Sequence, residues 1–384
     1  MSGTTVLIAA LSGRALAQSA RRAGFLPLVV DCFADLDMRQ AAHAWRTLPA
    51  AMTHGFHAKT LLGALGDLTR TSATPPLGLV LGAGFEDQPR LVERLEDTYR
   101  LLGCPASAIR ATKDPTIFFP LIASRGITHP ETRLAPPPSA EGWLSKRIGA
   151  SGGGHIQHVR KGKSVGGRRY YQRMAAGVPL SMLGIVGPRG AAFAFTRQWP
   201  SPTPVHPFRY GGAVGDVTLE AEFEARLVEI GVELSREFGL AGLVSFDFLE
   251  RDGEVSLLEI NPRAGASLDV LDDETGSLFA AHLAACLGED AIGPLSRTWT
   301  PRPRAAAYLY ADEGPLTIPV RDWPAWSADR PAAGTAIARG RPAATVIAEG
   351  KNATDAAATV HRLLGELGNM LYRPQKNTGK ETPQ

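Results

Sequence analysis

Apolar and polar positions in the first hundred residues follow the pattern of a doubly wound α/β domain. Apolar runs predict strands at 5–10, 26–31 and 77–82, and an amphipathic stretch predicts a helix at 13–23. Strands that alternate with helices are typical of a parallel sheet covered on both faces. Glycines gather at 82–86, after a strand, where such sheets bind ligands; a plain tight turn explains them equally well.

The loop after the first strand argues against a dinucleotide-binding enzyme. A Rossmann site needs the pattern GxGxxG at this place. Residues 11–14 contain a single glycine, Gly13. An oxidoreductase is therefore disfavoured.

From about residue 106 the pattern changes to longer strands joined by irregular segments. Pro115 suits the first position of a helix that ends near 125–126. The pattern then predicts strands at 127–132, 143–148 and 169–174, a hairpin at 182–195 and a helix at 220–239. Beyond Pro301, strands at 305–311, 336–339 and 343–347 and a helix at 354–371 predict a small α+β module, followed by a polar tail that we expect to be disordered.

Residues 244–263 carry the most informative pattern, a hairpin with one apolar and one polar face. The period of two puts Phe246, Phe248, Leu258 and Ile260 on the core side, and Asp247, Glu259 and Asn261 on the other. A three-residue turn at 251–253 places Phe246 opposite Leu258, with Asp247 and Glu259 as diagonal neighbours roughly 7–8 Å apart at Cα. A two-residue turn would flip one strand and bury the acids, so the three-residue turn is expected.

The polar face of this hairpin suits a cation. Two carboxylates that point at one place repel each other unless a cation lies between them. Oxygen ligands of this kind suit Mg²⁺, with substrate phosphates and water completing its shell. Arg263 follows on the same face and can bind a phosphate or a carboxylate through its fork of donors. A solvated polar face on an edge hairpin explains the pattern about equally well.

Composition and charge narrow the class of protein. The 384 residues are 44% hydrophobic and 21% charged, with a net charge of +3, so neither nucleic acid nor a membrane is indicated as a partner. Three cysteines without CxxC spacing argue against a disulfide framework or a zinc site. We find no signal peptide and expect a cytoplasmic protein.

A glycine-rich loop at 149–154 follows Lys146 on a predicted strand. Bare backbone lets amides approach phosphate oxygens, and a lysine beside it supplies a point charge. The order GxxxxGK[ST] is absent and strands flank the loop, which excludes a P-loop. A flexible hairpin tip is the alternative, and Lys113 near a helix start is a second phosphate candidate.

In this order the motifs resemble the ATP-grasp superfamily, of the carboxylate–amine ligase type. The motifs are Lys113, Lys146, the loop at 149–154, the segment Gln172, Gly177 and Ser181, and the terminal Glu259-x-Asn261-x-Arg263. The resemblance covers about residues 1–298. A weaker similarity connects the chain to tyramine–glutamate ligase-like proteins of one-carbon cofactor biosynthesis.

The resemblance implies an ATP-grasp fold in four segments. An N-terminal doubly wound α/β (pre-ATP-grasp) domain would span 1–105. The ATP-grasp domain would span 106–298, with its glycine-rich lid at about 140–197. The small C-terminal α+β module would span 299–375, and a disordered tail 376–384.

It also implies roles for individual residues. Asp247, Glu259 and Asn261 would hold Mg²⁺, with Mn²⁺ as a substitute, and Lys113 and Lys146 would contact the phosphates of ATP. The lid residues Ser151, Gly152, Gly153 and Gly154 would close over the triphosphate, and the backbone of Gln172, Arg173 and Met174 would bind adenine. Arg263 and Lys146 would be catalytic. Arg173 stands where many members have an acid, which leaves the ribose contact unassigned.

The proline-rich segment 198–212 is a candidate for the substrate pocket. It brings Arg209, Tyr210 and Gly211 together, and we expect Arg209 to bind a substrate carboxylate. A long surface connector is an equal alternative.

The resemblance thus implies an ATP-dependent ligase that activates a small acid as an acyl phosphate and joins it to an amine. The acid would be an amino acid or a cofactor precursor, and a homodimer is compatible with the sequence. An ATP-grasp carboxylase or purine-type enzyme and a non-catalytic nucleotide-binding regulatory protein are the alternatives.

Overall fold

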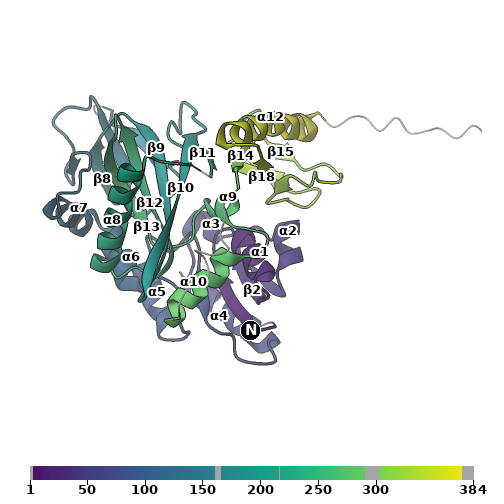
Figure 1. Cartoon of the computed structure of the whole chain (residues 1–384). Helices are drawn as coiled ribbons and strands as arrows, with labels where there is room; N and C mark the ends of the chain where they lie inside the picture. The colour runs from purple at the N-terminus through teal and green to yellow at the C-terminus, as the bar shows by residue number, and fades with distance from the viewer. Residues whose placement is uncertain (1–2, 161–165, 216, 290–301, 374–384) are drawn as a thin grey trace, which may run out of the picture.

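The computed structural model describes residues 3–160, 166–215, 217–289 and 302–373. The expected tail at 376–384 and the boundary at 298–299 lie outside these residues. Figure 1 shows three parts: an N-terminal α/β domain, a large sheet with helices on its outer face, and a C-terminal segment that lies above the N-terminal domain.

The N-terminal domain is the predicted doubly wound unit. Its parallel sheet has the order β3-β2-β1-β4, with β1 Thr5–Ala9, β2 Leu26–Asp31, β3 Ala44–Thr47 and β4 Leu79–Leu81. The helices are α1 Arg14–Arg22, α2 Leu36–Ala41, α3 Ala51–His54, α4 Ala58–Thr71 and α5 Pro89–Glu96. Val6 and Ile8 pack in the core that includes α1, whereas Leu7 packs with α4 on the opposite face. Both faces of β1 are therefore buried, as its continuous apolar run predicts.

The central sheet has eight strands in the order β13-β12-β9-β10-β11-β14-β18-β16. The predicted hairpin at 182–195 is confirmed and is longer, with β9 Val178–Gly187 and β10 Gly190–Pro200. The other strands are β11 Tyr210–Val214, β12 Gly242–Arg251, β13 Glu254–Asn261, β14 Arg304–Tyr310, β16 Ser327–Ala328 and β18 Pro342–Glu349. Helices α6 Ala106–Lys113, α7 Pro115–Ser124 and α8 Ala221–Glu237 share one core with this sheet, and α9 Leu268–Leu271 and α10 Ser277–Leu287 share the other core with the N-terminal domain.

A second, smaller sheet carries the glycine-rich loop. It has the order β5-β8-β6-β7, with β5 Thr132–Arg133, β6 Trp143–Arg147, β7 Gln157–His158 and β8 Arg169–Arg173. The strand predicted at 127–132 is wrong except for its last residue, because the chain there runs irregularly toward β5.

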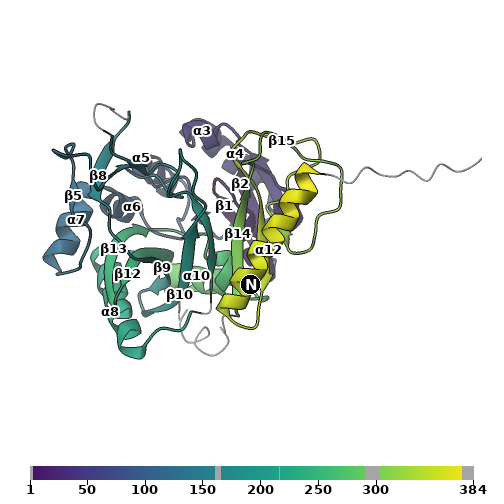
Figure 2. The same cartoon turned by 90° about the horizontal axis from the view of Figure 1, so that it is seen from above.

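The C-terminal segment extends the central sheet. Its strand β14 pairs with β11 through Gly212↔Ala307. Figure 2 shows α12 Ala353–Tyr372 alongside β14. The short strands β15 Leu316–Thr317 and β17 Ala336–Ile337 pair with each other. In the described part of the chain, no helix combines the length and apolarity that a membrane crossing requires.

Candidate functional site

The acid hairpin places Asp247 and Glu259 directly opposite each other. The predicted three-residue turn is wrong: Arg251 pairs with Glu254, and Asp252 and Gly253 form a two-residue turn with φ of 53° and 78°. Both residues adopt the left-handed conformation of a type I′ turn, which fits the twist of the strands.

A β-bulge corrects the register that this turn alone would give. The pairing shifts between Asp247↔Glu259 and Phe248↔Leu257, so Leu258 is the extra residue of β13. Leu257, rather than the predicted Leu258, therefore joins the core, and the acids keep the outward face. The predicted diagonal relation is replaced by a direct cross-strand pair.

Three side chains hold the two acids in place. Ser181 Oγ donates to Asp247 Oδ1 (2.7 Å) and Asn261 Nδ2 donates to Asp247 Oδ2 (2.9 Å). Lys113 Nζ donates to Asn261 Oδ1 (2.8 Å) and lies 3.3 Å from Glu259 Oε2. Lys113 is the last residue of α6 rather than the start of a helix, and the next helix begins at Pro115.

The neighbouring charges shift the pKa values of the two acids in opposite directions. Burial and the neighbouring Glu259 raise the pKa of Asp247. Burial also acts to raise the pKa of Glu259, but Lys113 and Lys146 outweigh it and bring that pKa below its usual range. The two carboxylates thus oppose each other's ionisation, which is the condition that a divalent cation relieves.

The donor set fits Mg²⁺ held together with a polyphosphate. In the described residues no group of three His, Cys, Asp or Glu side chains could hold a metal alone. Two carboxylates and one carboxamide are available, and Mg²⁺ is commonly held by one or two carboxylates plus substrate phosphates. Asp247, Glu259 and Asn261 would be those ligands.

Lys146 lies on β6, and its charge interacts with those of Glu259 and Asp247. Its side chain is buried, and its Nζ donates to Gln172 Oε1 (2.6 Å). Burial lowers the pKa of Lys146, while Glu259 acts in the opposite direction. Gln172 is in turn held by Thr132 Oγ1 (3.2 Å from Nε2), so its side chain positions the lysine.

The hinge amides predicted to bind adenine are already paired. Arg173 N donates to Glu131 O and Met174 N donates to Gly142 O, both at 2.8 Å. Neither amide can donate to a base without breaking these bonds. The half-exposed Met174 side chain remains available for contact with an apolar ring.

The glycine-rich loop at 149–154 is docked on the start of β11 and on the loop before it. Tyr210 N donates to Gly152 O (3.0 Å), and His206 Nδ1 lies 2.8 Å from Gly154 O. A Cβ on Gly153, which has φ of 71°, would lie 1.9 Å from Phe208 O, so the two backbones touch there. Ser151 is half-buried in the same loop.

Arg263 is held by an acid that the sequence did not single out. Arg263 Nε donates to Glu86 Oε1 (2.8 Å), and Glu86 Oε2 accepts from the amides of Gly84 and Phe85 (2.7 and 2.9 Å). Burial acts to raise the pKa of Glu86, but Arg263 and Lys113 outweigh it and lower that pKa. The position of Glu86 after the strand-end glycines was the signal that could have identified it.

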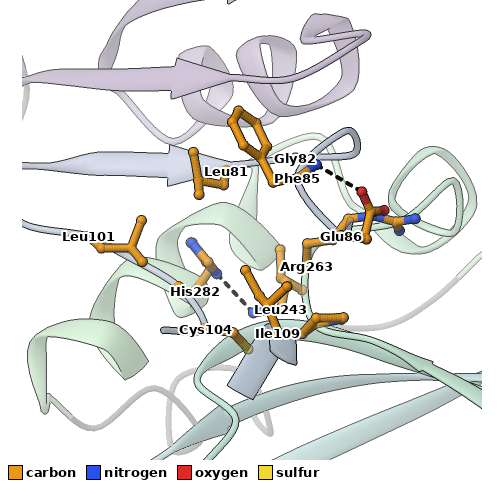
Figure 3. A pocket seen from close by; sticks show the side chains of 12 residues that line it. Leu81, Gly82, Phe85, Glu86, Leu101, Cys104, Ile109, Leu243, Arg263 and His282 are labelled. Carbon is orange, nitrogen blue, oxygen red and sulfur yellow. Dashed lines mark hydrogen bonds and ion pairs between the residues drawn. The ribbon is translucent and has the colours of Figure 1, made fainter. Parts of the chain in front are cut away.

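Figure 3 shows Glu86 and Arg263 beside a small cavity that His282 also lines. The cavity measures about 10 Å³, which is room for about one water molecule. The cavity lies between the N-terminal domain and the central sheet and is too small to hold a substrate.

The predicted substrate role of Arg209 is wrong, because its guanidinium is already bound. Arg209 is 5% exposed and makes bonds of 3.0 and 2.7 Å to the two carboxylate oxygens of Asp312. It also donates to the backbone and hydroxyl of Ser201 and lies 3.6 Å from the centre of the Tyr310 ring. Arg209 therefore ties the loop before β11 to the C-terminal segment.

Tyr210 and Gly211, predicted with Arg209, also serve this junction. The Tyr210 ring packs edge-on against Tyr308 at 5.2 Å, and Tyr310 Oη donates to Tyr210 O (2.7 Å). A Cβ on Gly211 would lie 2.7 Å from the backbone of Pro200, where β10 and β11 shift register. Gly211 has no side chain, so of the two only Tyr210 can present one near the acid hairpin.

Comparison with known proteins agrees with this geometry. Residues 117–267 match the protein-family model of the ATP-grasp domain. The chain is 23% identical over 255 residues to the carbamoyl phosphate synthase large chain of Myxococcus xanthus (strain DK1622), a match that covers 59% of this chain and 23% of that protein. The match thus spans less than a quarter of that relative's length.

Solved structures resemble the chain over most of its length. N5-carboxyaminoimidazole ribonucleotide synthetase from Thermotoga maritima superposes with a TM-score of 0.65 at 13% identity, covering 94% of this chain and 98% of that one. The biotin carboxylase domain of 2-oxoglutarate carboxylase from Hydrogenobacter thermophilus, solved with magnesium ADP and bicarbonate, gives 0.69 at 10% identity, covering 94% and 90%. The ATP-grasp resemblance predicted from the sequence is confirmed over residues 117–267, and the chain shares its fold along nearly its whole length with the synthetase and the carboxylase domain.

Proposed function

We propose that this protein is an ATP-dependent ligase that joins a small carboxylate to an amine through an acyl phosphate. The observation that carries the proposal is the convergence of Asp247, Glu259 and Asn261 with two lysines, Lys113 and Lys146, beside a docked glycine-rich lid. These residues lie far apart in the sequence, and the fold brings their charges together where they can bind a polyphosphate with its cation.

In the proposed reaction a carboxylate oxygen attacks the γ-phosphorus of ATP and ADP leaves. Lys113 and Lys146 would neutralise charge on the phosphates, and Mg²⁺, held by Asp247, Glu259 and Asn261, would supply further positive charge there. The amine then attacks the acyl carbon, phosphate leaves, and the nitrogen loses a proton. The lid excludes water from the acyl phosphate, which would otherwise hydrolyse.

Arg263 would bind the substrate carboxylate or the acyl phosphate. Its Nε is held by Glu86, and its Nη1 donates to the backbone of Ala264 (3.1 Å). These bonds fix the plane of the guanidinium and leave Nη2 for a ligand. A pre-oriented arginine loses less entropy on binding an oxyanion than a free one.

A carboxylase of the purine or biotin type is the second candidate. It is favoured by the likeness to N5-carboxyaminoimidazole ribonucleotide synthetase and biotin carboxylase, which extends through the C-terminal segment. In that case bicarbonate would be the acid. The three free cysteines support a reducing, cytoplasmic location for either enzyme.

The test is a coupled ADP-release screen over carboxylates, bicarbonate included, with and without amines, followed by mass spectrometry of the product. ADP release that needs both an acid and an amine supports the ligase; release with bicarbonate alone supports the carboxylase. Binding of ATP without any ADP release would overturn both and leave a regulatory protein.

Glu259→Gln tests the site itself, and we expect it to slow ADP release by about 100-fold or more. Glu254→Gln is the matched control, because Glu254 is an exposed acid on the same strand, β13. It should behave as the unaltered protein. Equal activity of the two variants would contradict the assignment of the acid hairpin.

A further inference from the structure

Tyr210, the first residue of β11, bonds through its backbone to two different parts of the chain. Its N–H donates to Gly152 O in the glycine-rich loop (3.0 Å), and its carbonyl accepts from the hydroxyl of Tyr310 at the end of β14 (2.7 Å). The two bonds lie on either side of the same Cα. Tyr210 therefore joins the glycine-rich loop to the C-terminal segment, and a displacement of this residue would change both bonds together.

The preceding residue, Arg209, anchors the same place to the C-terminal segment. Its guanidinium makes two bonds to Asp312 and lies over the ring of Tyr310. Its Nε donates to Ser201 O (2.9 Å), and Ser201 N donates back to Arg209 O (2.7 Å). The bond from Arg209 lowers the pKa of Asp312, so the carboxylate is ionised at neutral pH. Asp312 and Tyr310 thus fix both the side chain and the backbone that lead into Tyr210.

Two further contacts fasten the glycine-rich loop to residues 206–210. His206 Nδ1 donates to Gly154 O (2.8 Å), since a carbonyl oxygen can only accept. The backbones of Gly153 and Phe208 touch, because a Cβ on the glycine would lie 1.9 Å from the facing carbonyl oxygen. The C-terminal segment therefore positions the surface on which the loop rests.

The other side of the loop is held by different parts of the fold. Arg169 of β8 donates to His155 O (2.9 Å) and to Ser145 Oγ of β6 (2.6 Å). At Gly149, which has φ of 73°, an added Cβ would lie 2.6 Å from the Cα of Asp87 in the N-terminal domain. Neither contact involves the C-terminal segment, so the contribution of that segment can be removed separately.

We propose that Tyr310 and Asp312 are positioning residues that hold the glycine-rich loop down on the site, acting through Tyr210 and Arg209. The inference rests on the proposed ligase function, in which this loop keeps water from the acyl phosphate. A loop that opens for substrates and closes for chemistry has two positions in equilibrium, and bonds made only in the docked position favour closure. The C-terminal segment therefore limits how much of the activated acid is lost to water.

Hydrogen exchange of the full chain tests this connection without any substrate. Tyr310→Phe keeps the ring and removes only the hydroxyl that donates to Tyr210 O. Loss of one hydrogen bond shifts an equilibrium by about threefold to tenfold, and exchange through local opening increases by the same factor. We expect this increase at the amide of Tyr210 and also at that of Ile156, whose bond to Gly153 O (3.1 Å) belongs to the loop. Mass spectrometry of short peptides measures both.

Tyr372→Phe is the matched control. Tyr372 is also a half-buried tyrosine of the C-terminal segment, and its hydroxyl also donates to a backbone carbonyl, that of Gly314 (3.0 Å). Exchange at Ile156 should be the same in this variant as in the unaltered protein. The amides of β1, far from the loop, should exchange equally in all variants and report on the stability of the whole chain.

A second pair of variants tests the ion pair. Asp312→Asn removes the charge that Arg209 binds and should also accelerate exchange at Ile156 by about threefold or more. Glu313→Gln is its control, because the neighbouring Glu313 is an exposed acid paired with Arg373. That variant should exchange like the unaltered protein.

The ratio of ADP to ligated product is the readout that a purely structural role would not change. It is measured with the acid and amine that the ADP-release screen identifies. When the loop opens more often, water hydrolyses the acyl phosphate to the acid and phosphate. Tyr310→Phe should therefore increase the ADP that is released without product by about threefold or more, whereas Tyr372→Phe should keep the ratio of the unaltered protein.

Three results overturn the inference. Unchanged exchange at Ile156 in Tyr310→Phe and Asp312→Asn, even with faster exchange at Tyr210, means that the loop docks without help from the C-terminal segment. An increase at Ile156 no larger than that in β1 means a general loosening of the chain. Faster exchange at Ile156 with an unchanged ratio of ADP to product removes the protective role. The ligase proposal survives all three, and absence of ADP release would remove it while hydrogen exchange still decides whether the C-terminal segment holds the loop.

Discussion

His282 gives the structure a pH-dependent stability that can be calculated. It lies on α10, is 3% exposed, and bonds to the backbone of two other segments. Its Nδ1 accepts from Leu243 N (2.8 Å), and Nε2 lies 3.0 Å from Leu102 O. Protonating Nδ1 would destroy the first bond. Burial lowers the pKa of His282 from 6.5 to about 4, although the bond to Leu102 acts in the opposite direction.

The direction and the size of this pH dependence follow from the difference between the pKa of His282 in the folded chain and its pKa in the unfolded chain. Between pH 6.5 and about 4 the unfolded chain binds a proton at His282 and the folded chain does not, so the free energy of unfolding decreases as the pH falls. Each tenfold difference in proton affinity is worth about 1.4 kcal/mol, so the loss is roughly 2 kcal/mol by pH 5 and roughly 3 kcal/mol by pH 4.

Substitution His282→Gln isolates this contribution. Glutamine keeps one acceptor and one donor but cannot be protonated, so the variant should lose less stability than the unaltered protein between pH 8 and pH 5. We expect the difference between the two free energies of unfolding to change by about 2 kcal/mol over that interval. Urea unfolding at half-unit pH steps measures it.

His43→Gln is the control, because His43 is exposed, and its curve should follow that of the unaltered protein. The reasoning is refuted if the curves of His282→Gln and the unaltered protein run parallel from pH 8 to pH 5. That outcome would mean that the folded structure accommodates the protonated imidazole.

Two further predictions concern the lid and the C-terminal segment. Gly153→Ala should weaken MgATP binding about tenfold or more, because its methyl group would clash with the facing backbone and such overpacking costs about 1–3 kcal/mol. The control is Gly152→Ala, at a position with φ of 74° and no atom within 4 Å of the added Cβ, which should show only the smaller cost of the backbone conformation. Equal MgATP binding by the two variants would contradict the docking of this loop. Arg209→Met should lower the free energy of unfolding by about 2 kcal/mol, because it loses the bonds to the half-exposed Asp312 and to Ser201, whereas Arg302→Met at an exposed ion pair should cost less than about 1 kcal/mol. An increased KM for the acid substrate with unchanged stability would instead restore Arg209 as a substrate ligand.

The sequence predicted the face of the acid hairpin but not its register. The period of two in β12 and β13 is a local property, so the shared orientation of Asp247 and Glu259 could be inferred. The bulge at Leu258 is set by packing of Leu257 and Ile260 against the core, which depends on helices elsewhere in the chain. Turn length alone therefore gave the wrong pairing.

Charged partners that lie far apart in the sequence account for the remaining differences. Arg209 and Asp312 are separated by 103 positions, and Arg263 and Glu86 by 177. Nothing local shows which of the two arginines is already bound, since either guanidinium could bind a carboxylate. Only the folded chain shows that Arg209 is bound by Asp312, whereas Nη2 of Arg263 has no hydrogen-bond partner among the described residues.

The same distinction explains why the contacts between the N-terminal domain and the C-terminal segment were not predicted from the sequence. Asp31, Asp35 and Asp37 read as the ordinary end of a strand and cap of a helix, and Asp329 lies about 300 positions later. In the folded chain Arg14 binds Asp329, and Asp37 accepts from the amides of Asp329 and Arg330, so these residues fasten the two parts of the chain together. Such a contact is a property of the assembled structure, because each partner alone has the pattern of an ordinary strand end, cap or turn.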